Sequence, residues 1–250
     1  MLSPDNPECH EELSQLPLKS GKPTYIDKTF APDRATAIRL FDLAEAHGTP
    51  MFSTSALRFA SEYAELDSQG IQTINSWGPG AFSNYAIHQI EPIISLMGAN
   101  PLRVMYTGTA ESPALLIDFG DERQATINHL GDNCPFTLGI KQDTGSFSQV
   151  TANSNFFLLF IEQLVRFFES GRPTVASAET IAVITVIEYG MKQLRRLTYG
   201  WICLQPNQTK GLAQGHIGLV ASPFAHVQSY TSFRTFFLPF MCKGFHHSSL

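Results

Sequence analysis

The sequence lacks the features that mark several common classes of protein. Its formal net charge of −5 at pH 7 gives no reason to expect a nucleic acid or an acidic membrane surface as a partner. The longest strongly apolar run covers residues 156–161 and is too short to cross a bilayer. The first residues lack the charged, apolar and cleavage regions of a secretory signal. These absences favour a cytoplasmic protein that binds neither membrane nor nucleic acid.

Cysteine and histidine are present without the spacings that build disulfide frameworks or metal sites. The sequence has 4 cysteines and no C-x-x-C, which is typical of reduced cysteines that serve in packing. Its 8 histidines show no ligand spacing apart from the adjacent His246 and His247, which we interpret as incidental. We therefore expect no metal site.

Carboxylates are absent from residues 197–250. These 54 residues contain no Asp or Glu, although the preceding 196 contain all 22. They have 6 Phe and 4 His and keep neither a helical nor a strand period. Two explanations remain open, a basic C-terminal extension and a reading frame that is not the ancestral one. We favour the second, because a selected surface rarely loses every carboxylate, and we expect little packed structure in this tail.

What is present begins with a strand, a helix and a second strand. With 43% hydrophobic and 16% charged residues, the 250 residues can bury a core in one large domain or two small ones. A predicted helix over residues 8–19 precedes a short strand over 23–26. Asp33 is placed to cap a helix over 34–46, which precedes a strand over 50–54. This order predicts a βαβ unit with two parallel strands.

The pattern changes after about residue 60. A predicted helix over residues 86–97 precedes four β-rich runs, at 102–108, 114–119, 124–130 and 135–141. The turn residues between these runs predict an antiparallel meander. Two further helices are predicted over residues 155–170 and 178–196. An open antiparallel sheet with helices on one face is an α+β arrangement.

Four segments carry a further pattern. They are Gly21–Ala31 (GKPTYIDKTFA), Ser53–Phe59 (STSALRF), Gly80–Glu91 (GAFSNYAIHQIE) and Gly171–Glu179 (GRPTVASAE). In order and spacing they resemble the lysine motif, the domain crossover, the histidine motif and the G-x-P element of the Gfo/Idh/MocA family. The members of this family are nicotinamide-dependent oxidoreductases. The resemblance spans residues 8–196 and leaves the tail unmatched.

The resemblance implies a fold and an activity. The fold is α/β plus α+β: residues 1–55 form the C-terminal remnant of a Rossmann NAD(P)-binding domain, and residues 56–196 form an open, mostly antiparallel sheet with helices on one face. Residues 197–250 are an irregular tail. The implied activity is NAD(P)-dependent oxidation or reduction of a sugar, inositol or related polyol. The implied assembly is a homo-oligomer formed through the sheet of the second domain.

The resemblance also implies roles for individual residues. Lys28 corresponds to the lysine that reaches the reacting carbon beside the nicotinamide, so it contacts both substrate and cofactor. His88 corresponds to the acid/base histidine, since an imidazole can take the hydroxyl proton as hydride leaves. Asn84 stands where the family has an aspartate, one helical turn before His88, so we expect its amide beside the ring, where it can hydrogen-bond but cannot stabilise an imidazolium by charge. Thr29 stands where the family usually has proline. Arg58 is a candidate for substrate binding or an exposed structural arginine.

The dinucleotide site is the largest departure from the family. The sequence contains no G-x-G-x-x-G, the turn that carries a bound pyrophosphate to a helix N-terminus. A first βαβ unit with the next strand and helix would need about 80 residues upstream. We therefore expect impaired activity in this chain by itself. The alternative is a non-catalytic binding or oligomerisation domain.

Overall fold

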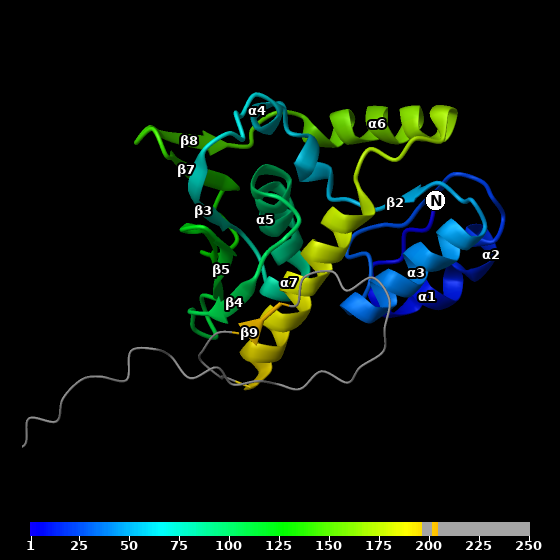
Figure 1. Cartoon of the computed structure of the whole chain (residues 1–250), viewed down its shortest axis with the longest axis horizontal. Coiled ribbons are helices and arrows are strands. Elements are labelled where there is room, and N and C mark those ends of the chain that lie inside the picture. The colour runs from blue at the N-terminus through cyan, green and yellow to red at the C-terminus, as the bar shows by residue number, and fades with distance from the viewer. Residues whose placement is uncertain (197–201, 205–250) are drawn as a thin grey trace, which may run out of the picture. The chain divides into compact units, whose positions relative to one another are not determined.

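The computed structural model describes residues 1–196 and 202–204, which belong to one compact unit of the chain. They form a two-stranded parallel sheet near the N-terminus and a seven-stranded, mostly antiparallel sheet with helices packed against it (Figure 1). Within the predicted tail, Ile202–Cys203 forms strand β9 and Leu204 is buried. These residues are packed, and the rest of the tail, on which the expectation of little packed structure depends, lies outside the described residues.

The predicted βαβ unit is confirmed. Strands β1 (Thr24–Tyr25) and β2 (Met51–Phe52) pair in parallel, and helix α3 (Arg34–Ala46) lies between them in the chain. The side chain of Asp33 caps this helix by accepting a hydrogen bond from the backbone N–H of Thr36 at 2.7 Å. The chain therefore enters the helix where the sequence predicts.

The predicted helix over residues 8–19 is instead three short pieces. They are the 3-10 turn η1 (Pro7–Cys9), α1 (His10–Leu13) and α2 (Gln15–Leu18). Pro17 has no backbone N–H to donate to the carbonyl of Leu13, so the α-helical ladder cannot continue through this point. Apolar spacing alone did not reveal this break.

The large sheet differs from a simple meander. Only β3 and β6 pair in parallel among its described strands, and the other neighbours are antiparallel. In sheet order its strands are β8 (Phe147–Thr151), β7 (Thr137–Gln142), β3 (Ile71–Gly78), β6 (Arg123–His129), β5 (Ala114–Gly120), β4 (Arg103–Tyr106) and β9.

The prediction that the run at 135–141 continues the meander is wrong. Strand β7 pairs with β3 and β8, and β3 separates β7 from β6. Both β3 and β8 escaped prediction, for different reasons. In β3 the inward positions include Ser76 and Gly78, which hide the alternation of apolar and polar side chains. The edge strand β8 is largely exposed, so it has little need of apolar residues.

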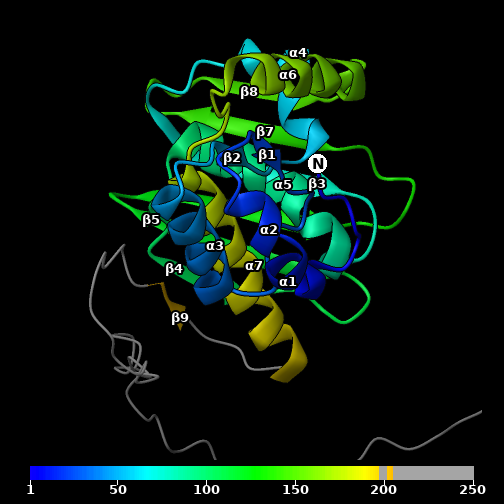
Figure 2. The same cartoon turned by 90° about the vertical axis from the view of Figure 1, so that its right-hand side faces the viewer.

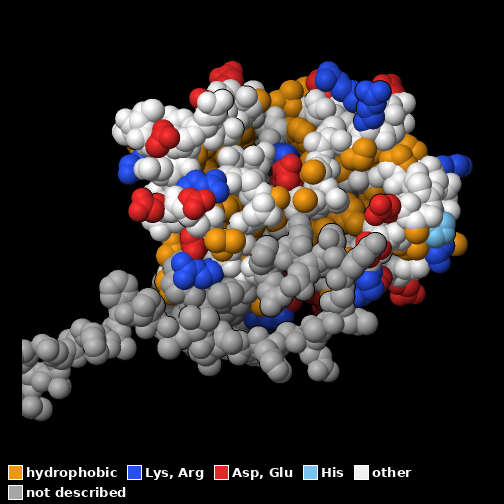
Figure 3. Space-filling model, viewed as in Figure 1, with side chains coloured by type: hydrophobic (Ala, Val, Ile, Leu, Met, Phe, Trp, Pro, Cys, Tyr) orange, Lys and Arg blue, Asp and Glu red, His pale blue; other side chains and the backbone are white. Residues whose placement is uncertain are grey.

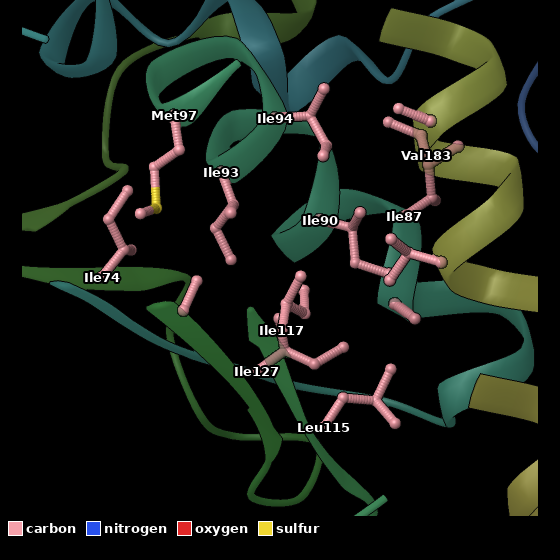
Figure 4. Packing of buried hydrophobic residues seen from close by; sticks show 14 of the residues in the cluster. Ile74, Ile87, Ile90, Ile93, Ile94, Met97, Leu115, Ile117, Ile127 and Val183 are labelled. Atoms are coloured by element: carbon pink, nitrogen blue, oxygen red, sulfur yellow. The ribbon is translucent and has the colours of Figure 1, made fainter. Parts of the chain in front are cut away.

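Helices α5 (Phe82–Met97) and α7 (Ser177–Arg196) cover one face of the large sheet. Isoleucines of α5 point into the sheet and meet side chains of β5 and β6 (Figure 4). Ile90 and Ile93 are fully buried there, as are Ile117 and Ile127 from the strands. Helix α5 begins one turn earlier than predicted and ends at Gly98, whose φ is +97°. This helix crosses the centre of the core and so fixes where its polar residues lie.

One face of the small sheet is covered by α6 (Phe156–Ser170). Successive side chains of a strand point to opposite faces, so Tyr25 and Phe52 share one face. The ring of Phe160 lies 5.6 Å from that of Tyr25, and the ring of Phe167 lies 4.7 Å from that of Phe52, centroid to centroid. All four side chains belong to one buried cluster.

The opposite face of the small sheet meets α3 and α7 (Figure 2). Ile26 and Met51 point this way and pack with Leu40 of α3 and Ile184 of α7. Helices α6 and α7 come from the segment assigned to the second domain, yet they enclose the strands of the first. None of the helices among the described residues is long and apolar enough to cross a membrane.

Candidate active site

Lys28 follows the carboxyl end of β1 and meets the start of α5. Its Nζ donates a hydrogen bond to Oδ1 of Asn84 at 2.8 Å. The Lys28 side chain is half-buried, whereas Asn84 is exposed in the first turn of the helix. The peptide bond between Lys28 and Thr29 is cis. A strand of the first segment and a helix of the second are therefore joined at this lysine.

His88 lies one helical turn beyond Asn84 on α5. Its Nδ1 is 2.6 Å from Oγ of Ser55, and its ring packs edge-on against the rings of Tyr85 and Phe136. Burial lowers the pKa of His88 to about 4, with smaller contributions from the positive charge of Lys28 and from His129. The imidazole is therefore neutral near pH 7 and can accept a proton.

The structure brings Lys28, Asn84 and His88 to one place but pairs them differently from the sequence expectation. Asn84 was expected beside His88, where its amide could hydrogen-bond the ring. Instead its Oδ1 accepts from Lys28, and the ring nitrogen of His88 is paired with Ser55. The amide of Asn84 therefore pairs with Lys28, and the ring of His88 is oriented by Ser55, in the segment that follows β2.

Arg58 lies in the 3-10 helix η2 (Ala56–Phe59), between two carboxylates. Its Nη2 donates to Oε2 of Glu179 at 2.7 Å, and its Nη1 lies 4.0 Å from Oε1 of Glu91. Its Nη1 is buried and has no hydrogen-bond partner among the described residues. The two ion pairs tie the crossover segment to α5 and α7, so the geometry fits a structural arginine better than a substrate ligand. The side chain is 13% exposed, however, and not on the surface as the structural alternative expected.

Glu91 is the most buried acidic residue of the site. Its Oε1 accepts from Oγ1 of Thr54 at 2.6 Å, and its Oε2 accepts from the backbone N–H of Ser55 at 2.7 Å. Burial raises the pKa of Glu91 to about 7, although Arg58 and these two hydrogen bonds oppose the shift. The carboxyl group therefore titrates near neutral pH.

Sequence reasoning did not single out Ser55, Glu91 or Glu179 as members of the site. Glu91 and Glu179 end two of the four segments that carry the family resemblance, and Ser55 lies inside a third. Their places in those segments were the available signal. A cluster of three or more His, Cys, Asp or Glu side chains that could hold a metal ion does not occur in the described part of the chain.

Comparison with known proteins places this geometry in a known fold. Neither a protein-family model nor a curated protein sequence matches the chain. Myo-inositol 2-dehydrogenase from Lactobacillus plantarum matches its structure with a TM-score of 0.65 at 12% identity, over 81% of this chain and 79% of that one. A Gfo/Idh/MocA family oxidoreductase from Vibrio cholerae matches with a TM-score of 0.58 at 15% identity, over 77% and 76%. The chain has the Gfo/Idh/MocA fold.

Another neighbour is GenD2 from gentamicin A biosynthesis, whose structure contains NAD. It matches with a TM-score of 0.64 at 13% identity, over 79% of this chain and 76% of that one. Because the identities are low, these Gfo/Idh/MocA-type neighbours establish the likeness of fold, and the chemistry has to be argued from the residues of this chain.

On the face drawn in Figure 3, acidic, basic and hydrophobic side chains are intermixed over the described residues.

Proposed function

We propose that this chain carries the substrate side of an NAD(P)-dependent oxidoreductase site that acts on a hydroxyl or carbonyl group of a sugar, inositol or related polyol. The observation that supports this is the meeting of Lys28, Asn84 and His88 at the end of β1 and the start of α5. Ligands of open α/β sheets bind at the carboxyl ends of the strands, which is where Lys28 lies.

Each residue has a task in this proposal. A bound nicotinamide supplies the hydride acceptor or donor, and Lys28 would contact it together with the substrate. The Lys28 ammonium donates a hydrogen bond to the reacting oxygen and stabilises negative charge as it develops. Neutral His88 accepts the hydroxyl proton at Nε2, provided that its Nδ1–H donates to Ser55 Oγ. Asn84 holds the lysine amine in place.

The fit to a whole dinucleotide is incomplete within these 250 residues. The carboxyl ends of β1 and β2 provide the lysine and the polar crossover segment, but the sequence holds no G-x-G-x-x-G to cradle a pyrophosphate. We therefore propose that this polypeptide by itself turns over its substrate poorly. A chimera in which the fingerprint-bearing half of a structural neighbour precedes Met1 should be the active form.

The chimera allows a direct test of the two residues. Lys28→Ala and His88→Ala should each lower kcat/KM for polyol oxidation by about 10²-fold or more, the range typical of general acid–base groups. Lys22→Ala and His47→Ala are matched controls, because both side chains are exposed and neither belongs to the candidate site. A folded chimera that binds NAD but oxidises no polyol would refute the proposed function, as would near-parental turnover in both site variants.

The second candidate is a non-catalytic binding or oligomerisation domain, and the absence of a glycine fingerprint favours it. In both candidates we propose that the chain forms homo-oligomers through the large sheet. Light scattering at micromolar concentration measures this directly, and a clean monomer would contradict it. Nicotinamide binding and turnover by the chimera separate the enzyme from the binding domain.

A further inference from the structure

Both carboxyl oxygens of Glu91 accept hydrogen bonds from two consecutive residues of the segment that follows β2. The residue is 3% exposed, and its two hydrogen bonds to Thr54 and Ser55 are 2.6 and 2.7 Å long. A buried carboxylate is costly, so an apolar or amide side chain would be the cheaper way to fill this space. We therefore explain the presence of a carboxyl group at position 91 by the hydrogen bonds that it accepts from Thr54 and Ser55.

One of these two residues, Ser55, is also the hydrogen-bond partner of His88. Ser55 is bound twice by α5: its N–H donates to Glu91, and its Oγ lies 2.6 Å from Nδ1 of His88. His88 and Glu91 are three residues apart on the helix and therefore share a face. Ser55 Oγ also accepts from the N–H of Leu57 and keeps a second lone pair, so toward the ring it can accept from Nδ1–H as well as donate its own O–H. Glu91 and His88 of α5 therefore both interact with Ser55, one at its backbone N–H and the other at its hydroxyl group.

We propose that Glu91 is a positioning residue, which acts through Ser55 to hold the ring of His88 in one orientation with its proton on Nδ1. This inference deepens the proposed function, because the orientation matters for catalysis only if His88 accepts a proton at Nε2. Arg58, 4.0 Å from Glu91, keeps the carboxylate paired inside the protein. Thr54 donates to the other carboxyl oxygen, which fixes the orientation of the carboxyl group toward Ser55.

The test measures His88 without any turnover. Nuclear magnetic resonance of the 15N-labelled full chain reports the pKa and tautomer of each imidazole, and the His88 signals are assigned by their loss in His88→Gln. In the parent protein we expect His88 to stay neutral down to a pH of about 4, with its proton on Nδ1. In Glu91→Gln and in Ser55→Ala the released ring should gain water contact, and its pKa should rise by about one unit or more toward 6.5.

The sign of the shift separates positioning from a direct charge effect. Because the pKa of Glu91 is about 7, its carboxyl group is largely uncharged where His88 titrates, and Glu91→Gln removes little charge there. Any charge that it does remove would lower the pKa of the imidazole, so a rise can come only from a change in the surroundings of the ring. The positive charge of Lys28 and the ring of His129 also lower the pKa of His88, and neither side chain is changed in these variants. Ser55→Ala tests the link between Ser55 and the ring. If Glu91→Gln does not fold, Glu91→Asp, which shortens the side chain by one methylene, tests the link between Glu91 and Ser55.

Glu62 provides the matched control. Its carboxylate holds another segment in the same way, accepting from the N–H groups of Asn153 and Ser154 and from Oγ of Ser154 at 2.6–2.9 Å. Glu62→Gln should leave the pKa and tautomer of His88 unchanged. An unchanged or lowered pKa with an unchanged tautomer in both folded site variants would overturn the inference. A shifted ring in a chimera that oxidises no polyol would leave the inference standing and refute the proposed function instead.

Discussion

At the scale of single residues, the side chain at position 84 sets the charge around Lys28 and His88. Asn84 offers its amide oxygen to the lysine, so Lys28 keeps its full positive charge toward the ring, and this charge helps to lower the pKa of His88. The histidine is therefore unprotonated over a wide pH range, but its low pKa also makes it a weaker base than an ordinary imidazole. The family pattern has an aspartate here, and the amide changes the electrostatics without removing the hydrogen bond.

Asn84→Asp tests this reasoning. An aspartate would pair with the Lys28 ammonium and place a negative charge one helical turn from His88. Both effects favour the imidazolium, so the pKa of His88 should rise from about 4, and the acidic limb of the kcat/KM profile of the chimera should move to higher pH. Asn84→Ala, which removes the hydrogen bond without adding charge, is the control. A limb that moves to lower pH, or that stays in place, would contradict the argument.

At the scale of elements, α5 aligns the site and α6 secures the sheet beside it. Asn84, His88 and Glu91 lie at spacings of four and three residues, so one helix presents all three on one side. Helix α6 has two apolar sides. One packs on the small sheet through Phe160 and Phe167, and the other is exposed, with Phe157 at 60%.

The two sides of α6 should respond differently to truncation. Phe160→Ala removes a 7% exposed ring that packs on Tyr25, and it should lower the free energy of unfolding by about 3–5 kcal/mol. Phe157→Ala removes a ring from the same helix that is mostly in water, and it should cost less than about 1 kcal/mol. Urea denaturation measures both values. Equal losses in the two variants would mean that α6 does not pack on the small sheet in solution.

At the scale of the whole molecule, two groups of the site oppose each other in the dependence of stability on pH. The pKa of His88 is about 4 in the folded chain and 6.5 ordinarily, so the unfolded chain binds more protons between these values and stability rises with pH. The pKa of Glu91 is about 7 when folded and 4.5 ordinarily, so its contribution is complete below pH 4.5 and is lost as pH rises through 7.

Because these contributions cancel, the parent protein should show a nearly flat stability between pH 4.5 and 6.5. Glu91→Gln removes the carboxyl contribution, so its free energy of unfolding should rise with pH across this window. The rise should be about 1 kcal/mol, because the expected increase in the pKa of His88 reduces the histidine contribution. His88→Gln leaves the carboxyl contribution alone and should show a fall of about 2 kcal/mol. Urea denaturation at the two pH values provides the comparison. The same slope in all three proteins would show that neither group is perturbed.

The whole chain should also bind its cofactor weakly. Without a glycine fingerprint in these 250 residues, we expect a Kd for NAD or NADP of about 1 mM or higher, a loss of about 4 kcal/mol relative to a micromolar site. Calorimetry on the chain and on the chimera measures the difference. Micromolar binding by the chain itself would mean that the pyrophosphate is held by residues outside the known fingerprint.

The sequence by itself determined the order and type of most elements and the lysine and histidine of the candidate site. The βαβ unit was predictable because Asp33 and Gly48 mark the ends of an amphipathic helix, a signal that needs only neighbouring residues. Lys28 and His88 were found because short motifs preserve their local spacing. The family resemblance, carried by four such segments, agrees with the observed fold.

Tertiary structure decided the arrangement of the large sheet and the pairing within the site. Strand β3 inserts between β6 and β7, and its partners are more than 40 residues away in sequence, so local periodicity carries no record of them. The contacts of Ser55 with Glu91 and His88, and that of Lys28 with Asn84, span 33 to 56 residues. Their chemistry exists only once the crossover segment is packed against α5. A hydrogen bond between distant residues depends on the whole core, and that is why only the folded chain could assign it.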